Sequence, residues 1–283
     1  MCTLSWLPAA EGYRLFFNRD ERLTRAPGRP PEPGVERGVR FLAPVDGDAG
    51  GTWIGVNEYG LAVALLNRYP SGAPGEHPWA GPRGRPANRI SRGILVRALL
   101  GCRDRAAAVR YLKTAELHRY EPFTAAFAGS PSTPRVAAGR ARPTGRDAGS
   151  RSRGKWPPLT IADWDRRRLV LEVHSAPGLV RTSSGHDQVA AARHRTARFE
   201  EMLAAGPPSV ERLRAFHRDH TPARGALSVC MHRDDAATQS YSEILVTPRT
   251  ATIVHRGGPP CRARTGRPTL RRLRRRRAGR SGQ

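Results

Sequence analysis

Apolar residues near the N-terminus fall into two short runs, separated by a segment that favours a turn. Residues 2–7 and 13–19 have the length and the pattern of β-strands, and residues 8–12 between them include proline and glycine. This pattern predicts a β-hairpin. The hairpin would carry residues 18–21, which are all polar or charged, back beside Cys2.

Two further strands are expected over residues 52–56 and 61–67, around a turn at 57–60. Every position of the second strand except its last is apolar, which is typical of a strand covered on both faces. The strand ends at Asn67, and functional groups gather at such strand-to-loop junctions. Residues 26–38, rich in Pro, Gly and Arg, are interpreted as a surface loop.

The rest of the chain alternates between pairs of strands and pairs of helices. Helices are predicted over residues 89–101, 104–118, 187–203 and 210–217, with Asp104 as an N-cap. Strands are predicted over residues 122–128, 159–162, 169–173, 227–231, 240–246 and 251–255. This order is what a sheet-on-sheet core flanked by helices produces, so we expect an α+β fold.

The charge is high and unevenly distributed. The 283 residues carry a formal net charge of +25, and only Lys113 and Lys155 among the basic residues are lysines. Residues 262–283 hold ten arginines and no acidic residue. We expect one domain over residues 1–261, with a disordered insertion at 139–157, followed by a disordered tail at 262–283. The tail lacks aromatic residues for base stacking, so we expect it to bind nucleic acid only non-specifically.

The four cysteines show neither a CxxC pair nor a dense framework. A reduced, cytoplasmic setting fits this usage best. The N-terminus has no secretory signal, and no apolar run approaches the length of a membrane span. We therefore expect a protein without a membrane span.

Cys2 follows the initiator methionine directly, and a residue this small permits removal of Met1. One residue would then carry both a thiol and a free α-amine, and an amine with a pKa near 8 can act as the base for the thiolate. The alternative is that Cys2 is a small buried hydrophobe.

Four segments together resemble the NRDE family, which includes the transport and Golgi organisation proteins. They are the start Met-Cys-Thr, the block Asn-Arg-Asp-Glu at 18–21, GGTWIGVN at 50–57 and GLAVALLN at 60–67. The family is similar in turn to the N-terminal nucleophile hydrolases of the bile-salt hydrolase, penicillin V acylase and acyltransferase group.

The resemblance implies a four-layer αββα sandwich and a site built around Cys2. It implies catalytic roles for Cys2 as nucleophile, for Arg19 and Asp20 in ordering the site, and for Asn67 as an oxyanion donor. The residues expected to contact the substrate are Asn18, Glu21, Trp53, Asn57, Ser183 and His232. Ser183 stands where relatives tend to carry asparagine, and a hydroxyl is a shorter donor than an amide.

Two other groups of residues have weaker signals. One of Arg193, Arg195 and Arg198 could point to the site, although a solvated face is the expected fate of each. Cys230, His232, His255 and Cys261 could bind zinc, but their spacing is not that of a zinc finger. We expect neither a metal nor an organic cofactor.

The leading hypothesis is therefore an amide hydrolase or acyltransferase that acts on a small-molecule acyl amide through a thioester. The alternative is a non-catalytic protein of the same fold that binds haem or acyl lipids. A weaker third idea is an Arg-rich RNA-binding protein.

Overall fold

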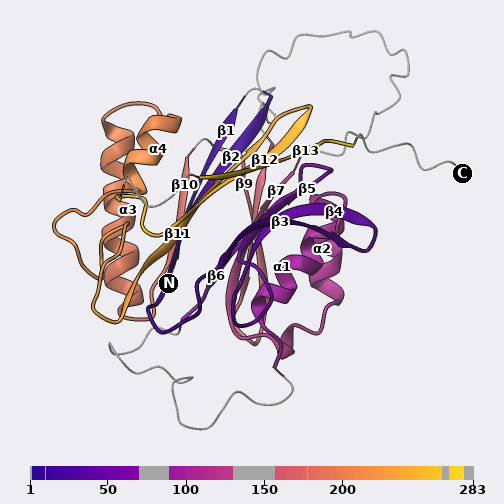
Figure 1. Cartoon of the computed structure of the whole chain (residues 1–283), viewed down its shortest axis with the longest axis horizontal. Coiled ribbons are helices and arrows are strands. Elements are labelled where there is room, and N and C mark those ends of the chain that lie inside the picture. Colours follow the sequence, from indigo (N-terminus) through magenta and orange to yellow (C-terminus); the bar gives the residue numbers. More distant parts are fainter. Residues whose placement is uncertain are drawn as a thin grey trace, which may run out of the picture.

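The computed structural model describes residues 2–9, 11–69, 89–129, 157–176, 178–262 and 268–276. Within these residues the strands form two antiparallel sheets that pack face to face, and helices cover the outer face of each sheet (Figure 1). From left to right in Figure 1 the layers are helix, sheet, sheet and helix. The fold is therefore the α+β, four-layer αββα sandwich that the sequence and the resemblance implied.

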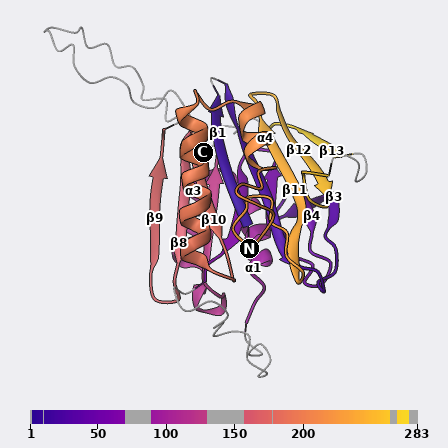
Figure 2. The same ribbon diagram turned by 90° about the vertical axis from the view of Figure 1, so that its left-hand side faces the viewer.

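The first sheet contains both termini of the described chain. In spatial order its six strands are β10 (Leu179–Ser183), β1 (Cys2–Ala9), β2 (Gly12–Arg22), β11 (Ala236–Val246), β12 (Thr250–Gly257) and β13 (Thr269–Arg274). The helices α3 (Gln188–Ala204) and α4 (Val210–Phe216) cover it, as Figure 2 shows from the helix side. The N-terminal hairpin thus occupies the middle of this sheet.

The second sheet is formed by the central part of the chain. Its seven strands, in spatial order, are β3 (Arg29–Glu36), β4 (Val39–Val45), β5 (Ile54–Asn57), β6 (Ala62–Asn67), β7 (Phe123–Ala128), β8 (Leu159–Trp164) and β9 (Leu169–His174). The helices α1 (Arg92–Leu100) and α2 (Arg105–Thr114) cover its outer face, and a short 3-10 helix, η1 (Leu117–Arg119), follows them.

Strand alternation decides which side chains meet between the sheets. On β1, Cys2, Leu4 and Trp6 point inward and join one core cluster with Ala64 and Leu66 of β6. The intervening residues of β1 face α3 and α4 instead, because successive side chains of a strand point to opposite faces. The N-terminal strand therefore has one face in the inter-sheet core and one under the helices.

Capping residues fix the ends of three helices. Asp104 accepts a hydrogen bond from the Ala107 N–H at the start of α2, as predicted. Asp187 caps α3 in the same way through the Ala190 N–H, 2.8 Å from its carboxylate. Ser209 caps α4 through the Arg212 N–H. Each side chain satisfies one of the amides that a helix N-terminus leaves without a partner.

Two of the predicted elements are wrong. The expected surface loop at 26–38 contains β3, which lies at the edge of its sheet, where prolines are tolerated because one side of the strand needs no ladder bonds. The expected strand at 227–231 is irregular. The Leu227 and Val229 carbonyls accept side-chain hydrogen bonds, from Arg195 and Asn18, in place of pairing with a strand.

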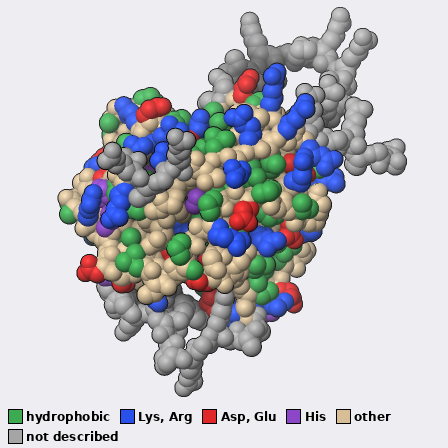
Figure 3. Space-filling view, in the orientation of Figure 1, with side chains coloured by type: hydrophobic (Ala, Val, Ile, Leu, Met, Phe, Trp, Pro, Cys, Tyr) green, Lys and Arg blue, Asp and Glu red, His purple; other side chains and the backbone are tan. Residues whose placement is uncertain are grey.

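The expectation of a wholly disordered tail at 262–283 is also wrong, because β13 pairs with β12 along its length. Leu273 packs against the inter-sheet core, and Arg275 donates to the carbonyls of Tyr59 and Thr247. Exposed arginines lie along this strand, and basic side chains gather at the corresponding edge of the molecule in Figure 3.

Most of the predicted insertion at 139–157 lies outside the described residues, as do residues 263–267 and 277–283 of the predicted tail. Among the helices of the described chain, none combines the length and the apolar character needed to cross a membrane.

Candidate active site around Cys2

Four side chains form a row across the inner face of the first sheet. Cys2 is paired with Arg19 of β2 on one side and with Ser183 of β10 on the other. Arg19 is paired in turn with Ser240 of β11. Cross-strand partners share a face of a sheet, so Ser183, Cys2, Arg19 and Ser240 lie side by side and face the second sheet. The predicted hairpin, which brings the Asn-Arg-Asp-Glu block back beside Cys2, is confirmed.

Cys2 is nearly buried. The residue is 7% exposed and belongs to the same core cluster as Trp53, just before β5, and Leu66 of β6. Burial raises the pKa of the Cys2 thiol above its usual range; Asp20 acts in the same direction, and Arg19 opposes both. At neutral pH the thiol is therefore protonated in this state and needs a base before it can act as a nucleophile.

Arg19 is held firmly beside Cys2. Its guanidinium donates to Asp46 at 2.9 Å and lies over the indole ring of Trp53, 4.4 Å from the ring centre. Glu21, at the outer end of β2, is a weaker partner at 3.4 Å. Since Asp46 and Trp53 belong to the second sheet's part of the chain, Arg19 connects the two sheets next to the thiol.

Three buried polar atoms around this row have no hydrogen-bond partner among the described residues. They are Nε1 of Trp53, Oγ of Ser183 and Oγ of Ser240. The three residues are 7%, 2% and 4% exposed, respectively. Buried polar atoms are paired in the great majority of cases, so a cluster of unpaired donors beside a thiol favours a site that receives polar atoms of a ligand.

Asp20 lies on the opposite face of the sheet from Arg19. Its carboxylate accepts from the hydroxyl of Thr238 at 2.7 Å and from Nη1 of Arg195 at 3.3 Å. The same Arg195 nitrogen donates to the hydroxyls of Thr3 and Thr182, the neighbours of Cys2 and Ser183 on their strands. The charge of Asp20 therefore raises the pKa of the Cys2 thiol from the opposite face of the sheet.

Of the three arginines of α3, Arg195 is the one that points to the site, and the solvated face expected for each is wrong for this residue, which is fully buried. The sequence contained a signal for this position. Arg195 lies four residues after Ala191 and four before Phe199, and both of these are buried. Residues at this spacing share one face of a helix, so Arg195 belongs to the stripe that packs on the sheet.

Two residues expected to contact the substrate have structural roles instead. The Asn18 amide donates to the carbonyls of His217 and Val229, and the residue is fully buried under the helices. Asn57 donates to the carbonyls of Leu100 and Cys102 and accepts from the turn that follows it. The polar atoms of both side chains are already used within the fold, which does not favour the expected contacts with a substrate.

A second polar group lies under the helices and was missed by sequence reasoning. Nε2 of His217 lies 2.8 Å from Oγ of Ser5, and Nδ1 lies 3.1 Å from Oδ1 of Asn18. A serine, histidine and asparagine in this order could activate a hydroxyl. All three are fully buried, however, so substrate has no access and the group serves the core.

Asn67 ends β6, as predicted, but its amide donates to the Tyr69 hydroxyl at 3.0 Å. It is paired with Phe123, whose ring packs on the helix side of the second sheet. The register therefore turns the Asn67 side chain away from the inter-sheet face that carries Leu66. This arrangement does not favour the side-chain oxyanion role expected for Asn67.

His232 is also not in the row beside Cys2. Its Nε2 atom lies 3.6 Å from Sγ of Cys230 and 3.4 Å from Sγ of Cys261. His255, which the sequence offers as a possible fourth zinc ligand, lies elsewhere: it contacts Ser242 and the Trp53 ring. Burial lowers the pKa of His255 to about 4, and Arg19 adds to this effect, so its ring is neutral at pH 7.

Comparison with known proteins identifies the fold. The family profile of Transport and Golgi organisation 2 matches residues 1–156. A search of curated proteins by sequence found no match.

Among solved structures, penicillin V acylase from Agrobacterium tumefaciens has a TM-score of 0.50 and 11% identity, over 92% of this chain and 84% of that one. A variant of the conjugated bile acid hydrolase from Clostridium perfringens has a TM-score of 0.50 and 11% identity, over 95% of this chain and 92% of that one. Both neighbours have the N-terminal nucleophile hydrolase fold, which this chain shares.

Proposed function

Because the chain belongs to the Transport and Golgi organisation 2 family, we propose that it is an amide hydrolase or acyltransferase whose nucleophile is Cys2, exposed by removal of Met1. The observation that carries the proposal is the row on the inner face of the first sheet, where Cys2 lies between Ser183 and Arg19. The unpaired donors of that row support it.

In the proposed reaction, the α-amine of processed Cys2 takes the thiol proton, and the sulfur attacks the carbonyl carbon of an amide. The carbon–nitrogen bond then breaks, and the α-ammonium returns its proton to the leaving amine. The product is a thioester on Cys2, which water or a second amine resolves to an acid or a new amide. Because burial raises the pKa of the thiol, the reaction depends on this internal base and on Arg19.

The developing oxyanion needs donors on the inner face of the sheet. Ser183 has an unpaired hydroxyl next to Cys2, and the Trp53 indole N–H lies unpaired on the facing sheet. The Asn67 backbone N–H is a third candidate. Leu65 donates to the Trp53 carbonyl and Arg68 donates to the Pro122 carbonyl. N–H groups alternate in direction along a strand, so the Asn67 N–H is directed to the Trp53 side.

The chemistry of the site favours a small acyl amide with an apolar acyl group. Leu66 and Trp53 supply apolar walls, while Arg19 is already paired with Asp46 and does not offer a free positive charge. The four cysteines are free, which agrees with a reducing compartment such as the cytoplasm.

A second candidate function is a binding pocket without catalysis. It is favoured by one observation: the thiol of Cys2 is almost enclosed and its pKa is raised, which is typical of an unreactive structural cysteine. In that case Met1 would remain attached, and the space between the sheets near Cys2 would have to open to bind an apolar ligand such as a lipid or haem.

N-terminal mass spectrometry combined with an electrophilic acyl-amide probe separates the two. The hydrolase proposal expects loss of Met1 and a probe adduct mapped to Cys2, abolished in Cys2→Ser and retained in the matched variant Cys102→Ser. Cys102 is also a buried cysteine, but it lies in the cluster under the other helix layer. An intact Met1, or hydrolysis of acyl amides that survives Cys2→Ser, would rule the proposal out.

A further inference from the structure

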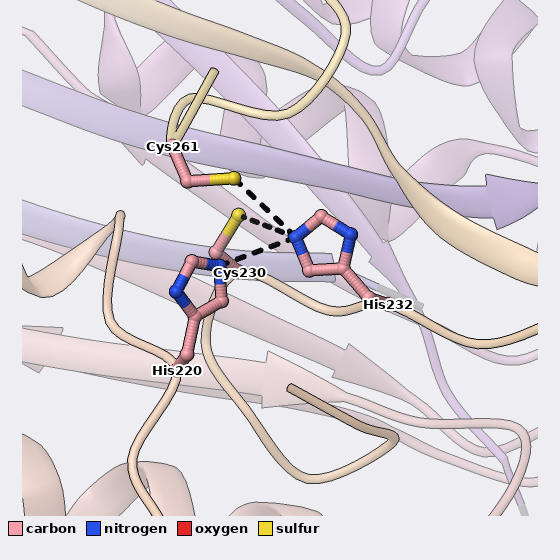
Figure 4. A group of neighbouring side chains, drawn as sticks. All are labelled: His220, Cys230, His232 and Cys261. Carbon is pink, nitrogen blue, oxygen red and sulfur yellow. Dashed lines mark hydrogen bonds between the residues drawn. The ribbon is translucent and has the colours of Figure 1, made fainter. Parts of the chain in front are cut away.

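Four potential metal ligands from separate segments converge on the helix side of the first sheet. They are His220, just after α4; Cys230 and His232, in the irregular segment before β11; and Cys261, just after β12. Their ligand atoms all lie within 4.8 Å of one another. Figure 4 shows the four side chains pointing toward a common centre.

The contacts of one nitrogen favour a metal site over a hydrogen-bonded cluster. Nε2 of His232 lies 3.2 Å from Nε2 of His220, 3.6 Å from Sγ of Cys230 and 3.4 Å from Sγ of Cys261. A ring nitrogen offers either one proton or one lone pair, so it can serve only one of these three neighbours well. A cation at the centre would satisfy all four groups together.

The spacing agrees with a tetrahedral zinc ion. Zinc–nitrogen and zinc–sulfur bonds of usual length, at tetrahedral angles, separate two nitrogens by about 3.3 Å and a nitrogen from a sulfur by about 3.6 Å. The nitrogen pair here is 3.2 Å apart, and the two nitrogen–sulfur pairs are 3.6 and 3.4 Å apart. The three distances to Nε2 of His232 therefore fit one ion bound by all four atoms, and the remaining pairs of ligand atoms lie within 4.8 Å.

The backbone holds the ligands in place without the ion. The Cys230 N–H donates to the Asp219 carbonyl at 3.0 Å, which joins the first and second ligand segments. His232 forms a β-bridge with Ala237, and the Gly258 N–H donates to the Gln239 carbonyl, which positions the turn that leads to Cys261. Hydrogen bonds thus fix all three segments next to one another.

We propose that His220, Cys230, His232 and Cys261 bind one Zn²⁺ ion. Two thiolates and two imidazoles are a donor set that selects zinc among the common divalent ions, and the two thiolates neutralise its charge. Four protein ligands leave no position open for water or substrate. The site is therefore structural, and its existence does not depend on the proposed hydrolase function.

The ion would strengthen the layer behind Cys2. The segment that carries Cys230 also supplies the Leu227 and Ala226 carbonyls, which accept hydrogen bonds from Arg195. Arg195 in turn holds Asp20. Zinc would attach this segment to the end of β12 and so keep the buried ion pair in position.

The test uses the full chain, purified under reducing conditions without a polyhistidine tag. We expect about one zinc per chain by elemental analysis, as one set of four ligands binds one ion. After replacement of zinc by Co²⁺, we expect the visible absorption of a tetrahedral ion together with thiolate-to-cobalt charge transfer. Zinc far below one equivalent, or a cobalt spectrum without thiolate bands, would overturn the proposal, and neither readout depends on a variant that must fold.

Variants then assign the ligands. Cys230→Ser and Cys261→Ser should each lose most of the bound metal, whereas Cys102→Ser and His118→Gln should keep it, because these residues lie outside the quartet. Metal retained by both cysteine variants would overturn the assignment. A Cys230–Cys261 disulfide in the reduced preparation, seen by mass spectrometry as the loss of two hydrogens without bound zinc, would also overturn it.

Discussion

Asp20 and Arg195 form an ion pair at 3.3 Å in which neither side chain is exposed to solvent. The pair lies directly behind Cys2, since Arg195 also donates to Thr3 and Thr182 on the two strands that meet at the candidate nucleophile. A helix of the outer layer is thereby joined to three strands of the sheet. The geometry of the inner face at Cys2 therefore depends on a charge interaction on the outer face.

Replacing Arg195 with methionine should destabilise the fold strongly, by about 3–5 kcal/mol, because Asp20 would be left as an uncompensated buried charge. Urea unfolding followed by circular dichroism measures this. The matched control is Arg193→Met, a change at an exposed position of the same helix, which should alter the free energy of unfolding by less than about 0.5 kcal/mol. Equal free energies of unfolding for the two variants would show that the Asp20–Arg195 ion pair does not stabilise the sheet behind Cys2.

Replacing Arg19 with glutamine should slow alkylation of Cys2. Arg19 lowers the pKa of this thiol against the effect of burial, so its loss leaves less thiolate at a given pH. A rise of one pKa unit would reduce the rate about tenfold below the pKa. The measurement is the rate of iodoacetamide modification mapped to Cys2 after Met1 removal. Arg22→Gln, at an exposed position of the same strand, is the control, and a rate unchanged in Arg19→Gln would contradict the electrostatic role.

The sequence predicted the part of the site that depends on local pairing. A hairpin places its strand ends together, so the neighbourhood of Cys2 and Arg19 followed from the turn at 8–12 and was confirmed by the register. It did not predict which face each residue of the polar block occupies. Asn18 and Asp20 point to the helices, and their partners, His217 and Arg195, lie 199 and 175 residues away in the chain.

The group around His232 likewise depends on contacts between distant segments, which the sequence does not predict. The sequence offers Cys230, His232 and Cys261 as possible ligands, but with His255 as the fourth, and its spacing does not predict a zinc site. His220 completes the group because the Asp219 carbonyl accepts from the Cys230 N–H and draws the end of α4 to this segment. Contacts between irregular segments have no periodic pattern in sequence, so composition and spacing could not identify them.

The C-terminal strand β13 provides a stability prediction with a control on the same strand. Leu273 packs on the inter-sheet core, whereas the Leu270 side chain is 52% exposed. Leu273→Ala should lower the free energy of unfolding by about 1–2 kcal/mol, because it removes partly buried apolar surface. Leu270→Ala should have little effect. Similar values for both variants in urea unfolding would mean that the strand does not pack against the core in solution.

The stability of the protein should fall between neutral and mildly acidic pH, and His217 should be one cause. Burial lowers the pKa of His217 to about 3, and Arg195 adds to this effect, whereas the unfolded side chain titrates near 6.5. Between these values the unfolded chain binds a proton that the folded chain does not, so stability is complete above about pH 6.5 and declines as the pH falls. The loss between pH 6.5 and 5 should be about 2 kcal/mol from this residue.

Urea unfolding of the wild-type chain and of His217→Gln at both pH values measures the contribution of this residue. The variant should be less stable at neutral pH, because glutamine cannot reproduce the imidazole contacts with Ser5 and Asn18, but its stability should depend less on pH. Some dependence should remain, since burial also lowers the pKa of His255 to about 4 and acts in the same direction. His118→Gln, at an exposed position, should retain the wild-type slope. An unchanged slope in His217→Gln would mean that His217 takes up a proton in the folded state, and the polar group under the helices would then have to be solvated.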